Sequence, residues 1–104
     1  MLELRPNCEL CDRDLPPAAT DARICSYECT YCAGCVETRL MNVCPTCGGG
    51  FAPRPIRPQT AFRPALNLGL AHHPPSTKRR ASKFSAEDIA AHVARIKDIP
   101  PHER

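Results

Sequence analysis

Three features of this 104-residue chain predict a small, metal-stabilised α+β fold: clustered cysteines, few aromatic residues, and a short head followed by a proline-rich tail. The cysteines all fall in the first 47 residues, at Cys8, Cys11, Cys25, Cys29, Cys32, Cys35, Cys44 and Cys47. Aromatic residues make up only 5% of the chain, and there is no tryptophan. In a head of this size a hydrophobic core alone usually fails. We therefore expect irregular loops, a short β-hairpin and a short helix held by metal, plus a C-terminal amphipathic helix.

The cysteine spacing predicts two zinc ions. It runs C-x2-C, thirteen residues, C-x3-C-x2-C-x2-C, eight residues, C-x2-C. Tetrahedral zinc takes four ligands, and a C-x2-C pair can hold an ion from one tight turn. Eight thiolates thus match two ions with none left over, and we expect the metal-free head to be unfolded. Because sulfur fills every position, we expect no catalytic residue and no enzyme activity at the metal.

Disulfides, redox chemistry and iron–sulfur clusters are the rival uses of these cysteines. The N-terminal residues lack the apolar core of a signal peptide, and no run approaches the ~18 residues that span a membrane. We therefore expect a cytoplasmic protein without membrane contact, where reducing conditions favour metal over disulfides. No thioredoxin-like βαβ pattern hosts the C-x2-C pairs, and the spacing follows neither common iron–sulfur pattern.

Two pairings of the eight ligands are open at this point. A sequential arrangement would use Cys8, Cys11, Cys25 and Cys29 for one ion, and Cys32, Cys35, Cys44 and Cys47 for the other. A cross-brace would join the first C-x2-C pair to the third pair, and the second pair to the fourth. The dense central run from Cys29 to Cys35 favours interleaving, because alternate pairs can face opposite sides of a short hairpin.

The same spacing resembles the RING finger in an all-cysteine form. RING fingers often carry an aliphatic residue between the first two ligands, an aromatic before the fifth and a proline after the seventh; here these are Leu10, Tyr31 and Pro45. Residues 36–40 could form the short helix that often follows the sixth ligand. The resemblance covers residues 8–47 and implies a cross-brace. Its two ligand sets would be Cys8, Cys11, Cys32 and Cys35 (site 1), and Cys25, Cys29, Cys44 and Cys47 (site 2).

The N-terminal segment also resembles a family of small, uncharacterised bacterial cysteine-rich proteins. The resemblance rests on the opening LELRPNC at residues 2–8, on DLPP at 14–17 and on ICS at 24–26. It implies zinc binding and no known activity. It also bears on the RING resemblance, because most bacteria lack ubiquitin.

Composition divides the chain into four parts: a RING-like zinc domain (1–51), a basic proline-rich linker (52–84), an amphipathic helix (85–99) and a tail (100–104). Residues 48–84 carry seven Lys or Arg and no Asp or Glu, whereas residues 1–47 carry four basic and seven acidic side chains. The prolines break any long helical or strand pattern in the linker. Alternating leucines at 66, 68 and 70 would suit one short strand.

The C-terminal helix has a clear beginning and an apolar stripe. Ser85 is a good N-cap, and Asp88 follows at the capping-box position. Ile89, Val93 and Ile96 recur at helical spacing. A helix this short is marginal alone in water, so the stripe should dock on the head, on another copy or on a partner.

The favoured function is a structural zinc module that binds an unknown protein partner. Its contact residues would be Leu10 and Pro45, which could form a shallow apolar groove, together with Ile89, Val93 and Ile96. The alternative for these two groove residues is that Leu10 simply packs in the core and Pro45 shapes a turn. The oligomeric state is left open by the sequence.

Two alternative functions use other features. The RING resemblance implies a ubiquitin-ligase-like protein that docks a conjugating enzyme. Against it, three glycines follow Cys47 where many active RING ligases place a basic residue near the last ligand, and the nearest one here is Arg54. The other alternative is non-specific nucleic-acid binding through Lys78, Arg79 and Arg80. The basic arm could instead lie on the acidic head.

Overall fold

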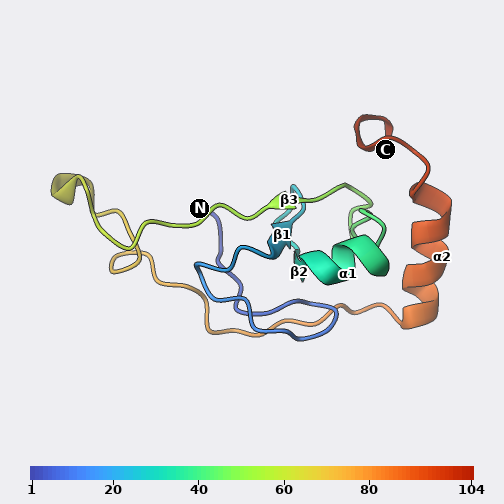
Figure 1. The fold of residues 1–104 in the computed structure, drawn as a ribbon, viewed down its shortest axis with the longest axis horizontal. Helices are drawn as coiled ribbons and strands as arrows, with labels where there is room; N and C mark the ends of the chain where they lie inside the picture. The colour runs from blue at the N-terminus through green and yellow to red at the C-terminus, as the bar shows by residue number, and fades with distance from the viewer.

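The regular elements are short and widely spaced in the computed structural model, which describes all of residues 1–104 (Figure 1). In chain order they are β1 (Ala22–Ile24), β2 (Thr30–Cys32), α1 (Ala33–Thr38), β3 (Ala52–Pro53), a 3-10 helix (Pro64–Leu66), α2 (Ala86–Ile96) and a second 3-10 helix (Pro101–Glu103). None of these helices has the length and apolar character that crossing a membrane would require. The α+β class expected from the sequence is confirmed.

The three strands form one antiparallel sheet in the order β2-β1-β3. Arg23 in the central strand lies opposite Tyr31 on one side and Pro53 on the other. The β1–β2 hairpin is the short hairpin that the sequence predicts. The third strand comes from residues assigned above to the linker, so the sheet continues past Phe51. Pro53 is tolerated there because β3 is an edge strand.

Helix α1 follows β2 without a connecting loop. Cys32 ends the strand and serves as the N-cap in an extended conformation, with φ −79° and ψ 154°. The helix therefore begins at Ala33, three residues before the range expected from the sequence. As a result, Cys32 and Cys35 are held by the end of a strand and the first turn of a helix.

A small core lies beneath the sheet and α1. Leu4, Leu15, Leu40 and Val43 are almost completely buried, and so is Tyr31. The Tyr31 ring meets that of Phe51 edge to face, with centroids 5.5 Å apart. Three cysteines, Cys8, Cys32 and Cys35, belong to the same buried cluster. These three cysteines are therefore part of the core itself.

A buried arginine fastens the segment after β3 to the head. Arg54 is only 4% exposed, and its guanidinium donates to the carbonyl oxygens of Arg5, Leu15 and Pro16 at 2.8, 3.1 and 3.0 Å. No carboxylate accompanies it, and burial lowers the pKa of Arg54. These bonds join three parts of the head that are far apart in the sequence.

The linker first leaves the body of the molecule and then returns to it. Residues 58–70 form the loop at the far left of Figure 1, closed at its base by the N–H of Leu70, which donates to Pro58 O at 3.0 Å. The short strand considered for residues 66–70 is wrong. Pro64 starts a 3-10 helix instead, and Asn67 and Gly69 take positive φ values of 52° and 99°, which interrupt any extended run.

Residues 76–82 return as an arm that lies along the N-terminal loop. Its backbone is bonded to the head at Leu4 and Glu9, through the N–H groups of Ser76 and Ser82. Asn7, which is fully buried, bonds to both the N–H and the carbonyl of Arg80. These bonds therefore hold residues 76–82 against the head as an ordered strap.

Helix α2 docks on the chain's own head. The Ser85 Oγ accepts a hydrogen bond from the Asp88 N–H at 3.1 Å, which is the cap expected from the sequence. Ile89 and Val93 are each 6% exposed and join the main buried cluster, and Ile96 packs at its margin. The apolar stripe is thus covered within a single chain.

We predict that Arg54→Ala lowers the free energy of unfolding by about 2–4 kcal/mol, because it leaves buried carbonyl groups without a donor. Urea unfolding of the metal-loaded chain measures this. Arg63→Ala is the matched control, since Arg63 is exposed and its side chain makes no hydrogen bond or ion pair. Equal unfolding midpoints for the two variants would show that the buried guanidinium does not hold the segment in place.

Candidate metal centre

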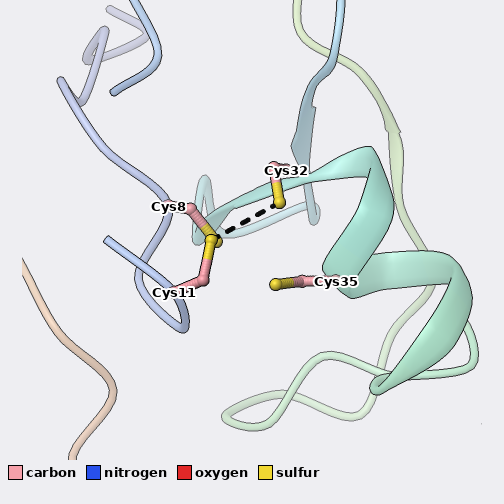
Figure 2. A group of neighbouring side chains, drawn as sticks. All are labelled: Cys8, Cys11, Cys32 and Cys35. Carbon is pink, nitrogen blue, oxygen red and sulfur yellow. Dashed lines mark hydrogen bonds between the residues drawn. The ribbon is translucent and has the colours of Figure 1, made fainter. Parts of the chain in front are cut away.

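Four thiols from two parts of the chain meet in the first cluster (Figure 2). The sulfur atoms of Cys8, Cys11, Cys32 and Cys35 all lie within 4.8 Å of one another. The Cys11 and Cys32 sulfurs are 3.7 Å apart. Ligand sulfurs about 2.3 Å from a tetrahedral zinc would be separated by about 3.8 Å. This cluster has the size and the donor set of a four-sulfur metal site.

The second cluster joins the turn after β1 to the loop after α1. The sulfurs of Cys25, Cys44 and Cys47 lie within 4.8 Å of one another. Cys29 lies beside this trio, and hydrogen bonding from the Cys44 and Cys25 thiols lowers the pKa of Cys29 to about 6. The first C-x2-C pair is therefore grouped with the third pair, and Cys25 of the second pair with the fourth.

The two C-x2-C turns that supply one half of each cluster have the same backbone geometry. In residues 8–13 the Cys8 N–H donates to Arg13 O at 2.8 Å, and the Asp12 N–H donates to Cys8 O at 2.9 Å. Residues 44–49 repeat both bonds at the corresponding positions, with the same distances. The residue after the second cysteine has a positive φ in both turns, 65° in the first and 76° in the second.

Backbone amides donate to two of the cluster sulfurs, one in the turn of residues 44–49 and one in the turn after β1. The Gly49 N–H donates to the Cys47 sulfur at 3.4 Å, and the Tyr27 N–H donates to the Cys25 sulfur at 3.3 Å. An amide donor stabilises the thiolate form of cysteine. Both contacts therefore place an amide donor against a sulfur that would ionise on binding a metal.

The neighbouring polar residues fix the first turn against the sheet. The Glu9 carboxylate accepts from the Arg5 guanidinium at 2.8 Å and from the Thr30 N–H at 2.6 Å. The Glu9 N–H in turn donates to Thr30 O at 2.9 Å. Because Glu9 follows Cys8 and Thr30 belongs to β2, these bonds set the distance between the two halves of the first cluster.

Burial favours the protonated form of several of these thiols when no cation is present. It raises the pKa of Cys8 and Cys35, and it raises that of Cys25 to about 11. For Cys44, hydrogen bonding with Cys29 is the main cause of a raised pKa, and burial adds to it. A divalent cation would supply the positive charge that lets four adjacent sulfurs ionise.

All eight cysteines are free thiols in this structure. The 3.7 Å between the Cys11 and Cys32 sulfurs is far longer than a disulfide bond of about 2.05 Å. Each cluster is therefore a group of separate thiols and not a disulfide.

The residues expected to contact a partner are mostly covered by the chain itself. Pro45 is buried, and Leu10 is partly buried against the core. Ile89 and Val93 of α2 are buried against the head, as described above, and Ile96 is half-buried. The sequence left three docking sites open for the apolar stripe of α2: the head, another copy or a partner. In this structure the stripe docks on the chain's own head.

The basic arm, residues 76–82, also forms ion pairs with the head. Arg79 pairs with Asp12 and Asp14 at 2.9 and 2.6 Å, and Arg80 pairs with Glu3 at 3.1 Å. Lys78 is exposed. Two of the three residues considered for nucleic-acid contact thus lie on the acidic head.

Two residues important to the site were missed by the sequence reasoning. Arg54 was noted only as the nearest basic residue after the last cysteine. His92 was not used at all, yet its Nε2 lies 3.0 Å from the carbonyl oxygen of the ligand candidate Cys44. A histidine beside the apolar stripe of α2 was the available signal, because such a position faces whatever the helix packs on.

The fold and the clusters define a small cysteine-rich protein with two candidate metal centres. Comparison with protein families matches residues 1–57 to DUF1272, described as a protein of unknown function. This match covers more than half of the chain and all eight cysteines, so the chain belongs to that family. The expected resemblance to a small bacterial cysteine-rich family is confirmed.

A bacterial relative supports the same assignment. "Uncharacterized protein R02474" of Rhizobium meliloti (strain 1021) is 60% identical over 63 residues, which cover 61% of this chain and 75% of that protein. No solved structure matches the chain significantly.

We predict that metal affinity rises with pH across the neutral range. Metal binding displaces protons from thiols whose pKa is raised, so a lower pH favours the protonated, metal-free chain. The dissociation constant should fall at least about tenfold per pH unit between pH 6 and 8. Competition with a chromophoric chelator of known proton affinity measures it. A dissociation constant that did not vary with pH would contradict thiolate ligation.

Proposed function

We propose that this chain is a non-enzymatic zinc protein, in which two structural four-cysteine sites hold a protein-interaction module in a RING-like cross-brace. The observation that carries the proposal is the grouping of the thiols. Two clusters draw on alternating cysteine pairs, and each contains a C-x2-C turn of the same geometry.

The donor set supports zinc. Sulfur ligands in tetrahedral geometry are typical of zinc or iron–sulfur sites, and the cysteine spacing follows neither common iron–sulfur pattern. The sulfur separation in the first cluster agrees with a central zinc. A bound ion would replace the protons that burial otherwise keeps on Cys25 and Cys35.

A structural role is supported by the closure of each site. Catalytic zinc sites have three protein ligands and one open position for water or substrate. Here each ion would have four sulfur ligands, so no water would be activated. The binding energy of each ion would instead go into holding together segments far apart in the sequence.

The proposed cross-brace is supported by the segments that each cluster joins. The first cluster ties residues 8–11 to the β2–α1 junction, and the second ties residues 25–29 to residues 44–47. Each ion would thus hold a loop that lies between the ligands of the other ion in the sequence. Loss of either ion should therefore loosen both sites.

A protein-binding role is supported by the proposed closure of both metal sites, which would leave no position for a substrate. The ubiquitin-ligase alternative is weakened by Pro45, which is buried, and by the glycines after Cys47. The nucleic-acid alternative is weakened by the ion pairs of Arg79 and Arg80 with the head. Neither alternative has a specific observation in its favour.

Chelation tests the structural role. We expect the purified chain to carry two zinc ions, measured by native mass spectrometry, and to lose its dispersed amide NMR signals when a strong chelator removes them. The C-terminal apolar stripe should then be released as well. A chain that kept its dispersed spectrum without metal would overturn the proposal.

Cadmium substitution tests the cross-brace. In the chain loaded with ¹¹³Cd, the β-protons of Cys8, Cys11, Cys32 and Cys35 should couple to one cadmium resonance and those of the other four cysteines to a second. A sequential arrangement would instead couple Cys8 and Cys25 to the same ion. That outcome would leave zinc binding intact and reject the RING-like pairing.

A further inference from the structure

Two arginines from the C-terminal half of the chain donate to the two C-x2-C turns. The Arg79 guanidinium donates to the carbonyl oxygen of Asp12 at 2.7 Å. The Arg104 guanidinium donates to the carbonyl oxygen of Gly48 at 3.1 Å. Asp12 and Gly48 each follow the second cysteine of their turn, and their φ values are 65° and 76°. The two arginines therefore hold equivalent positions of the two turns.

A second side-chain contact recurs at the first cysteine of each turn. The Asn7 amide donates to the carbonyl oxygen of Cys8 at 3.1 Å, and His92 Nε2 lies 3.0 Å from that of Cys44. Asn7 also bonds to the backbone of Arg80, and His92 lies on α2. Each turn is thus connected to the returning chain at two carbonyl groups, one at its first cysteine and one after its second.

The position that each arginine holds lies next to the exposed ligand of that cluster. Cys11 and Cys47 are the two exposed cysteines, and the other six are buried or half-buried. Cys11 directly precedes Asp12, and Cys47 directly precedes Gly48. An incoming chelator would reach these two sulfurs first, because the others are covered. Moving either sulfur out of its cluster requires local opening of the turn, which the arginine bond opposes.

The two arginines lie on separate segments. Arg79 belongs to the arm, residues 76–82, which runs in orange beside the N-terminal loop in Figure 1, and it also pairs with Asp14 at 2.6 Å. Arg104 follows α2 and also donates to the carbonyl oxygen of Asn42 at 2.7 Å. Neither segment supplies a strand of the sheet or any of the eight cysteines. Either one could therefore leave its turn without breaking the sheet.

We propose that Arg79 and Arg104 control metal exchange at the two candidate centres separately, Arg79 at the first cluster and Arg104 at the second. This rests on the proposed function and adds the regulation of the same two sites. Each arginine is a positioning residue, because it contacts a backbone carbonyl and not a sulfur. Displacing the arm would favour metal release from the first cluster, and displacing the C-terminal segment would favour release from the second.

Site-resolved metal loss tests this in the full chain loaded with ¹¹³Cd. Each centre should give its own cadmium resonance, and the decay of each resonance is followed after excess EDTA is added. Initial rates are compared, because loss of one ion should loosen the other site. The variants are Arg79→Ala and Arg104→Ala. Arg80→Ala is the matched control, since Arg80 lies on the same arm but its side chain bonds to Glu3 and not to a turn.

We expect Arg79→Ala to speed the initial loss from the first cluster at least about threefold and to leave the second unchanged, as the loss of one or two hydrogen bonds would do. Arg104→Ala should show the opposite preference, and Arg80→Ala should match the wild-type chain at both centres. Arg79→Lys and Arg104→Lys, which keep the charge and one donor group, should restore slower loss. Unchanged rates in either alanine variant of the two, or faster loss from both centres alike, would overturn the proposal.

Metal content before EDTA is added separates this inference from the proposed function. If the wild-type chain binds no metal, the proposed function fails. If it holds two ions and their release does not respond to Arg79→Ala or Arg104→Ala, only the control by these arginines fails. A variant purified with its own centre empty and the other filled would support the proposal, whereas a variant that lacked both ions would overturn it.

Discussion

The fold depends on eight thiols drawn into two groups inside a head that has few large apolar residues. Four sulfurs within 4.8 Å of one another are unfavourable as isolated thiolates, and burial raises the pKa of several of them. A shared cation would supply the positive charge that these sulfurs need, and it would link distant parts of the chain. The sheet, α1 and the small core are then packed around these two centres.

Polar residues of the head also join segments that are far apart in the sequence. Arg54 is buried with three carbonyl acceptors and no counter-ion, and Glu9 joins the first C-x2-C turn to β2. The arm then places Arg79 and Arg80 on the acidic head. The basic segment that suggested a nucleic-acid contact is therefore a strap whose charge complements the domain beneath it. Its exposed ion pairs give orientation more than stability, since water screens them.

The C-terminal helix extends the small interior. Its stripe packs on the core of the head, and His92 lies 3.0 Å from the Cys44 carbonyl oxygen. The head and the helix that covers part of its core thus belong to one chain. This explains why the expected partner residues, Leu10, Pro45, Ile89, Val93 and Ile96, are mostly covered here.

The sequence by itself determined the elements whose signals are local. Cysteine spacing indicated the tight turns, Ser85 and Asp88 marked the start of α2, and the composition of residues 1–47 showed that apolar burial would be small. The tertiary structure decided what depends on distant contacts. Which cysteine pairs share a cluster, the burial of Arg54, the course of the proline-rich arm and the docking of α2 all join residues far apart in the chain. Local spacing carries no information about such contacts, because their free energy arises only when the whole head is assembled.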